Sequence, residues 1–205
     1  MKTILIATSN PGKLRDFAGA AAKFGINIAP LPGFASIPTV TEDGLTFEAN
    51  AYKKAMEYSR YAPGQLVLAD DSGLEVDALG GAPGVYSARY AAADPQAAES
   101  NTDDGANNAR LIRELKGVPG AEATARFVCV IAAALDGNVQ KVCRGTAEGM
   151  ILKTPRGTHG FGYDPLFYFP FIQKTFAELT AEEKADYSHR GAAFRELLDW
   201  WQKEK

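Results

Sequence analysis

Short apolar runs alternate with amphipathic segments along the first third of the chain. Apolar residues fill positions 4–7, 26–31 and 66–69, a length typical of buried strands. Between them, apolar residues recur at helical spacing over 13–24 and from 47 to about 60. Strands that alternate with helices in this way predict an α/β fold.

The second half of the chain changes this alternation. Residues 107–115 have the pattern of a helix, and two strand-like runs, 126–135 and 139–149, flank the hairpin signal Asp136-Gly137. Thr180-Ala-Glu-Glu183 has the capping-box pattern and opens a C-terminal helix that extends through Trp201. We therefore expect a mixed sheet flanked by helices, in a single domain over residues 1–205 that no long linker interrupts.

Composition and charge exclude several classes of partner. The chain has 205 residues and a net charge of −3, which argues against a nucleic acid polymer as the main ligand but allows a single nucleotide. Cys129 and Cys143 lie in apolar runs far from any CxxC spacing, so we expect neither a disulfide framework nor a cysteine metal site. No segment has the pattern of a signal peptide or a membrane span. We expect a cytoplasmic protein without a membrane partner.

The sequence Asp70-Asp71-Ser72-Gly73 follows the apolar run 66–69 directly. Carboxylates in such a place are costly unless they meet a cation, a donor or water. We expect the strand to end at this point, where open α/β sheets bind ligands. Successive strand side chains face opposite ways, so one aspartate could bind a metal while the other holds backbone donors. A plain strand end with two carboxylates is the structural alternative.

A second polar loop, Thr8-Ser-Asn-Pro-Gly-Lys13, follows the first apolar run. It is not a Walker loop, because Ala7 replaces the first glycine and Leu14 the hydroxyl residue. Backbone N–H groups at the start of the next helix could bind an anion, with Lys13 adding charge. The alternative is an ordinary strand–turn–helix connection with a solvated lysine.

Three further groups of polar residues are candidates for chemistry. Glu42, in Thr41-Glu-Asp43, supplies an oxygen ligand of the kind that Mg²⁺ prefers, although acidic residues also suit a helix start. Asn50 and Lys54 share a helix face, and such a polar face usually meets solvent. In Gly160-Phe-Gly-Tyr-Asp-Pro165, an aromatic ring could stack on a base and the acid could bind one, unless the loop simply buries its aromatics. Lys184 and Ser188-His-Arg190 lie opposite the apolar stripe of the C-terminal helix, where solvation is the ordinary outcome.

In this order the motifs closely resemble those of the non-canonical purine nucleoside triphosphate pyrophosphatases, also called inosine/xanthosine triphosphate pyrophosphatases. The resemblance extends over essentially the whole chain. The matching segments are Ala7-Thr-Ser-Asn-Pro-Gly-Lys13, Gly44-Leu-Thr-Phe47 with Asn50-Ala51, Ala69-Asp-Asp-Ser-Gly-Leu74, Leu79-Gly-Gly-Ala-Pro-Gly-Val-Tyr-Ser-Ala-Arg-Tyr90, Gly160-Phe-Gly-Tyr-Asp-Pro165 and Ser188-His-Arg-Gly191.

The resemblance implies a Mg²⁺-dependent hydrolysis of a purine nucleoside triphosphate (ITP, dITP or XTP) to the monophosphate and pyrophosphate, which removes deaminated purines from the nucleotide pool. It implies a homodimer of chains that each have an elongated, two-lobed α/β fold, with the nucleotide in the central cleft between the lobes. Carried over by motif, Glu42 and Asp71 bind the metal, and Asp71 is also the general base. The triphosphate is bound by Thr8, Ser9, Asn10, Pro11, Gly12 and Lys13, and Ser72 is a further substrate contact. The base pocket is formed by Phe161, Gly162, Tyr163, Asp164, Lys184, His189 and Arg190.

Two positions depart from the family pattern. Ala49 stands where bacterial relatives often have a glutamate, although Glu48 lies next to it, and His159 stands where a smaller residue is usual. An enzyme of the same fold for modified pyrimidine or canonical triphosphates is one alternative, which the base-pocket residues would decide. A nucleotide sensor without turnover is another, but it predicts loss of the metal carboxylates or Lys13, and the chain has them all.

Overall fold

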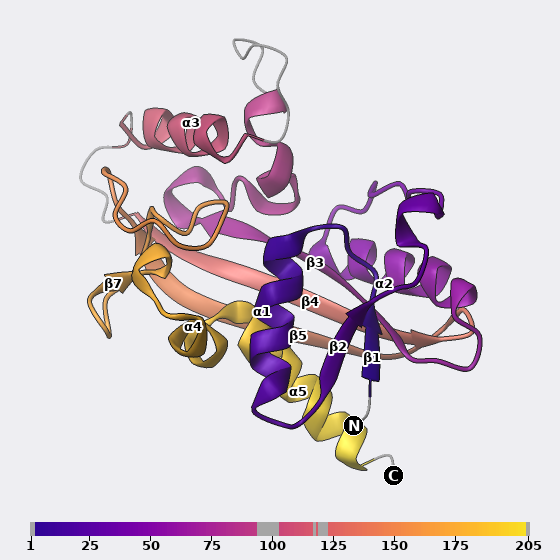
Figure 1. Ribbon diagram of the computed structural model, residues 1–205. Coiled ribbons are helices and arrows are strands. Elements are labelled where there is room, and N and C mark those ends of the chain that lie inside the picture. Colours follow the sequence, from indigo (N-terminus) through magenta and orange to yellow (C-terminus); the bar gives the residue numbers. More distant parts are fainter. Residues whose placement is uncertain (1–2, 94–102, 117, 119–122, 204–205) are drawn as a thin grey trace. The chain divides into compact units, whose positions relative to one another are not determined.

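The computed structural model describes residues 3–93, 103–116, 118 and 123–203, and its strands form a mixed sheet in the order β2-β1-β3-β4-β5-β6-β7 (Figure 1). β1 is parallel to β2 and β3, whereas β6 is antiparallel to β5 and β7. The strands are β1 (Thr3–Ile6), β2 (Asn27–Pro30), β3 (Val67–Val76), β4 (Thr124–Leu135), β5 (Asn138–Ile151), β6 (Phe167–Phe169) and β7 (Lys174–Thr175). The α-helices are α1 (Pro11–Ala22), α2 (Phe47–Tyr58), α3 (Asp104–Lys116), α4 (Ala181–Tyr187) and α5 (His189–Lys203). The predicted mixed α/β fold is confirmed.

The chain divides into two compact units. Unit 1 comprises Met1–Ser72, Cys129–Thr146 and Ala181–Lys205, and unit 2 comprises Gly73–Val128 and Ala147–Thr180. The chain passes from one unit to the other within β3, β4 and β5. The single domain over residues 1–205 stays a prediction. In the described part of the chain, no helix has the length and apolar character that a membrane span requires.

Unit 1 is built around an apolar core between strands and the helices α1 and α5. Alternate residues of β4, among them Cys129 and Ile131, face this core together with Phe17 of α1 and Phe194 of α5. The intervening β4 residues, such as Val130, are also fully buried, so both faces of the strand are covered. This burial explains why β4 reads as a continuous apolar run rather than an alternating one. Figure 1 shows α1 lying beside α5, in agreement with their packing contacts.

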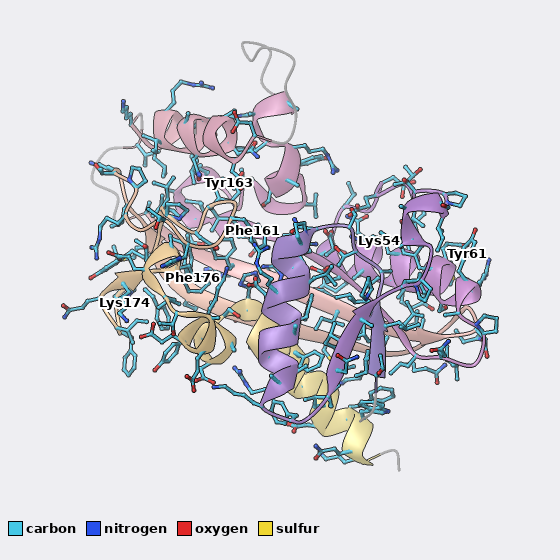
Figure 2. All side chains as sticks on the ribbon, viewed as in Figure 1. Lys54, Tyr61, Phe161, Tyr163, Lys174 and Phe176 are labelled. Atoms are coloured by element: carbon cyan, nitrogen blue, oxygen red, sulfur yellow. The ribbon has the colours of Figure 1, made fainter. Side chains whose placement is uncertain are left out.

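Unit 2 has its own core, which is rich in aromatic side chains. The rings of Phe127, Phe167 and Phe176 pack against one another with centroids 4.6 to 5.5 Å apart. Tyr163 belongs to the same core, and Figure 2 labels it with Phe176. Its hydroxyl group donates a hydrogen bond of 2.8 Å to the carbonyl oxygen of Ser87, which satisfies the polar end of a buried ring.

Two predicted boundaries are wrong, and one predicted turn is confirmed. The strand expected to end before Asp70 continues to Val76. The expected single C-terminal helix is two, because α4 ends at Tyr187 and α5 begins at His189. The hairpin at Asp136-Gly137 is confirmed: both residues have positive φ (49° and 81°), as the tight turn between β4 and β5 requires.

A close approach of β5 to the start of α5 makes Gly145 essential for packing. A Cβ atom there would lie 2.2 Å from the His189 carbonyl oxygen and 2.4 Å from the Ala193 nitrogen. We expect Gly145→Ala to lower the free energy of unfolding by about 2 kcal/mol or more, because backbone atoms would have to move. Gly19→Ala on α1 is the control: its Cβ would meet nothing nearer than 3.9 Å, so it should raise stability by about 0.5–1 kcal/mol. Urea unfolding measures both, and equal stabilities for the two variants would contradict the packing argument.

Candidate active site

Asp70 and Asp71 lie inside β3, and their side chains point to opposite faces as strand alternation predicts. The Asp70 carboxylate forms an ion pair of 2.9 Å with the Nζ of Lys13 from α1. The Asp71 carboxylate accepts a hydrogen bond of 3.0 Å from the Nδ2 of Asn50 from α2. Both aspartates are buried, with exposed fractions of 3% and 7%. Two carboxylates are therefore buried side by side, each compensated by a different helix.

The loop at residues 8–13 is organised by Asn10, which caps α1. The Asn10 Oδ1 accepts hydrogen bonds from the N–H groups of Gly12 (2.8 Å) and Lys13 (3.1 Å), and its own N–H donates to Thr8 Oγ1 at 3.2 Å. Pro11, at the first helical position, has no N–H to offer. An anion at this helix start would compete with Asn10 for the two N–H groups. The positive charge of the loop comes from Lys13.

The Asn50 side chain links Asp71 of β3 to the backbone of Gly44 by hydrogen bonds, and we call this arrangement the interlock of Gly44 with Asn50. Its Oδ1 accepts a hydrogen bond of 2.8 Å from the Gly44 N–H, while its Nδ2 donates to the Gly44 carbonyl (3.3 Å) and to Asp71. A Cβ atom on Gly44 would lie 2.6 Å from Oδ1, closer than real Cβ contacts come. Only glycine therefore lets the segment before α2 reach Asn50.

Lys54 brings an ammonium group to two of the carboxylates (Figure 2). Its Nζ lies 2.7 Å from the Glu42 Oε2 and 3.6 Å from the Asp71 Oδ1. The solvated face expected for Asn50 and Lys54 is wrong, because both side chains are buried. Burial acts to lower the pKa of Lys54, but the surrounding carboxylates, Asp71 first, outweigh it and raise the pKa above its usual value.

The two adjacent aspartates have pKa values displaced in opposite directions. Burial acts to raise the pKa of Asp70, but Lys13 and two other cations outweigh it, so the pKa lies below its ordinary value of 3.8. Burial raises the pKa of Asp71 above 3.8, although Lys54 and the Asn50 hydrogen bond oppose this shift. Environments that separate two neighbouring carboxyl groups in this way are typical of sites with distinct ionic and proton-accepting roles.

A second chain of contacts leads from Asp70 to α5. The Ser72 hydroxyl donates to Asp70 Oδ2 at 3.1 Å and accepts from the Arg190 Nη2 at 2.7 Å. The Arg190 Nη1 donates at 3.1 Å to Oδ2 of Asp16 on α1, and the Lys184 Nζ lies 3.5 Å from the same oxygen. Helices α1, α4 and α5 are thus tied together by charged groups next to β3.

The predicted solvation of Lys184, His189 and Arg190 is wrong. Their exposed fractions are 7%, 1% and 5%, because the helix breaks after Tyr187 and its polar residues turn inward against α1. Burial, followed by the nearby positive charges of Arg190 and Lys184, holds the pKa of His189 well below its usual value of 6.5. The imidazole is therefore neutral at physiological pH.

The glycine-rich loop at 160–164 belongs to unit 2, where its own contacts hold it. The Asp164 Oδ2 accepts a hydrogen bond of 3.0 Å from the Phe161 N–H. The Gly162 N–H donates to Asp104 (2.6 Å), and the Gly162 carbonyl accepts from Asn108 (2.9 Å), both residues of α3. Phe161 is half-buried, and the His159 side chain before the loop is exposed.

The carboxylates of Glu42 and Asp71 fit a divalent cation in their chemistry. They are hard oxygen donors that already share one positive group, the Lys54 ammonium. In the described residues no three or more His, Cys, Asp or Glu side chains gather as a metal cluster. Glu48, next to the departure at Ala49, forms an ion pair with Arg144.

Sequence reasoning missed Asp16 and gave Asn50 no role in the site. The signal for Asp16 was its place three residues after Lys13, which puts both side chains on one face of the predicted helix. The signal for Asn50 was the pair Gly44 and Asn50 within one motif, since a glycine beside a buried amide indicates a close backbone approach.

Comparisons with known proteins agree on one family. A sequence model of the Ham1 family matches residues 4–200. The chain is similar to a dITP/XTP pyrophosphatase of Geobacillus kaustophilus, with 49% identity over 98% of this chain and 95% of the relative. It is 50% identical to a dITP/XTP pyrophosphatase of Acidobacterium capsulatum, over 96% of each chain. Among solved structures, the Staphylococcus aureus Ham1 protein matches with a TM-score of 0.81 and 39% identity, over 100% of both chains.

The opposite displacement of the two aspartate pKa values is directly measurable. We expect carboxyl-carbon NMR titration of the metal-free protein to show Asp71 titrating above 3.8 and Asp70 below it. Asp71→Asn should remove the higher midpoint and so assign it. Because the pKa of Asp70 is depressed by folding, the stability it contributes is present above its unfolded value and is lost as the pH falls through its folded value. The reverse order of the two midpoints would contradict the charge arrangement described here.

Proposed function

The chain belongs to the Ham1 family, and we propose that it hydrolyses non-canonical purine nucleoside triphosphates (ITP, dITP and XTP) to the monophosphate and pyrophosphate. Such an enzyme removes deaminated purines from the nucleotide pool. The observation that carries the proposal is the buried pair in β3: Asp70 is held ionised by Lys13, while Asp71 has a raised pKa beside Glu42 and Lys54. Asp70 and Asp71 thus bring a cationic loop and a carboxylate site close together. In the hydrolysis of a phosphoanhydride, the cation suits the departing pyrophosphate and the carboxylate suits the attacking water.

The reaction breaks the bond between the α-phosphorus and the oxygen that leads to the β-phosphorus. Water attacks the α-phosphorus, its proton passes to the Asp71 carboxylate, and pyrophosphate leaves with the bonding electrons. In the metal-free protein, burial raises the pKa of Asp71, which favours proton uptake by its carboxylate. Negative charge grows on the departing pyrophosphate, and the Lys13 ammonium of the loop at 8–13 stabilises it.

Mg²⁺ is part of the proposal, with Glu42 and Asp71 as the residues that would hold it. When bound, the ion supplies Lewis acidity and lowers the pKa of water. The remaining residues of the triphosphate site are Thr8, Ser9, Asn10, Pro11 and Gly12, with Ser72 as a further substrate contact. The Ser72 hydroxyl is hydrogen-bonded to both Asp70 and Arg190, so it links the two side chains.

Base selection rests on the purine 6-position. Hypoxanthine and xanthine carry an oxygen there, and a fixed donor such as Arg190 or Lys184 satisfies it. Adenine presents an amino group, which sets donor against donor, and a buried mismatch of that kind gives discrimination of roughly 10⁴-fold. By the family resemblance, Phe161, Gly162, Tyr163, Asp164 and His189 complete the proposed base-binding set. Guanine also has the 6-oxygen, so its rejection requires a contact at the 2-amino group.

The proposal extends to the protein's setting. The family resemblance implies a homodimer, and we propose a homodimer in the cytoplasm whose partner is a free purine nucleotide rather than a nucleic acid polymer or a membrane. The net charge of −3 supports this partner, since a triphosphate needs only a few cations while a polymer needs a basic surface.

The test of the proposed activity is pyrophosphate release from ITP, XTP, dITP, GTP and ATP, with Mg²⁺ and with a chelator. We expect release from ITP, XTP and dITP to be fast, release from GTP and ATP to be slow, and both to stop in chelator. Comparable rates for all five would reject the base selection and direct attention to His159. Binding without release from any of them would favour a sensor.

Removing the proposed base tests the assignment of roles. Asp71→Asn should lower kcat for ITP by about 10²-fold or more, because the amide cannot accept the proton from water. Asp77→Asn is the matched control, since Asp77 is an exposed aspartate paired with Arg126 in unit 2, and its kcat should stay at the wild-type value. Both variants should give the circular dichroism spectrum of the wild-type protein. Near-normal turnover of Asp71→Asn would exclude this residue as the base.

A further inference from the structure

We infer that Asp16 is a positioning residue that holds Arg190 and Lys184 in place to read the purine, and that it acts on base recognition without acting on the triphosphate. This inference deepens the proposed function and rests on it, since Arg190 and Lys184 are the proposed base donors. Asp16 is not a group that we place against the substrate.

One carboxylate oxygen of Asp16 gathers both cations. Its Oδ2 lies 3.1 Å from the Arg190 Nη1 and 3.5 Å from the Lys184 Nζ. The three side chains are shielded from solvent, with exposed fractions of 12% for Asp16, 6% for Arg190 and 9% for Lys184. Because water screens these charges little, the attraction of each cation to Asp16 is much stronger than in a surface pair.

The Arg190 guanidinium is held from two sides. Nη1 donates to Asp16 on α1, and Nη2 donates to Ser72 Oγ on β3 at 2.7 Å. Two fixed contacts at different nitrogens determine the plane of a rigid guanidinium and not only its position. Without the Asp16 charge, Arg190 and Lys184 would lose the carboxylate oxygen that both contact, and their mutual repulsion in a buried place would be less compensated. Asp16 therefore sets both the spacing and the orientation of the two donors.

The phosphate side has a separate anchor. Lys13 lies three residues before Asp16 on the same helix, yet its ammonium pairs with Asp70 at 2.9 Å. Asp16 thus contacts the cations of α4 and α5 directly, while Asp70 pairs directly with the cation of the loop and is linked to Arg190 through the Ser72 hydroxyl. Loss of the Asp16 charge should weaken the reading of the base and leave the affinity for a chain of phosphates unchanged.

The experiment compares Asp16→Asn with wild type on ITP, ATP and inorganic tripolyphosphate. We expect the KM for ITP to rise about tenfold or more, the loss typical of one charged hydrogen bond, with a smaller change in kcat. The ratio of kcat/KM for ITP to that for ATP should fall. Inhibition by inorganic tripolyphosphate, which has no base, should keep its wild-type constant. Asp16→Glu, which keeps the charge, should recover part of the ITP affinity.

Asp186→Asn is the matched control for a purely structural role. Asp186 on α4 pairs with Lys23 at the end of α1 at 2.6 Å, so it also ties these helices together, but it is exposed. Its KM for ITP should equal that of wild type. An unchanged KM and ITP preference in Asp16→Asn would overturn the inference, as would an equal loss of tripolyphosphate binding.

A spectroscopic readout separates this inference from the proposed function. Rotation of the Arg190 guanidinium about its Nε–Cζ bond, followed by nitrogen NMR, should be slow in wild type and faster in Asp16→Asn. If wild type showed no preference for ITP, the proposed base selection would fail. Arg190 rotation would still decide whether Asp16 positions the side chain, and an unchanged rate would overturn that.

Discussion

Two carboxylates buried next to each other in an apolar strand are the constraint on which the site depends. A buried charge is tolerated only with a partner, and alternation along β3 sends Asp70 and Asp71 to opposite faces, so each carboxylate has a different nearest cation. The chain supplies Lys13 from the start of α1 on one face and Lys54 from α2 on the other. Each helix thus brings one cation to the carboxylates of β3.

The carboxylates on the two faces of β3 have different partners, and this difference separates their proton affinities. Asp70 sits against a direct ion pair and a hydroxyl group, so its charge is fixed. Asp71 has a more distant ammonium and a neutral amide donor, so burial dominates and its proton affinity rises. Two chemically identical side chains thus have pKa values on opposite sides of the ordinary value. Local geometry, not residue type, causes this difference.

Sequence periodicity predicted α1, α2, the β4–β5 hairpin and the opposite facing of the two aspartates, because these follow from spacing within a few residues. It failed where distant residues decide. Aspartate is disfavoured in strands, so the continuation of β3 through Asp70 could not be predicted without knowing that Lys13 would pair with it. The burial of Arg190 likewise depends on Asp16, which lies far away in the chain. The motif resemblance identified the family where periodicity could not.

The interlock of Gly44 with Asn50 restricts the order in which mutations can accumulate. A side chain at position 44 would collide with the Asn50 amide, and a smaller residue at 50 would leave the Asp71 carboxylate without its amide donor. Each substitution alone is therefore harmful, while a compensating pair would have to pass through a damaged intermediate. The effect of a substitution at either position depends on the residue at the other, so we expect Gly44 and Asn50 to remain fixed together.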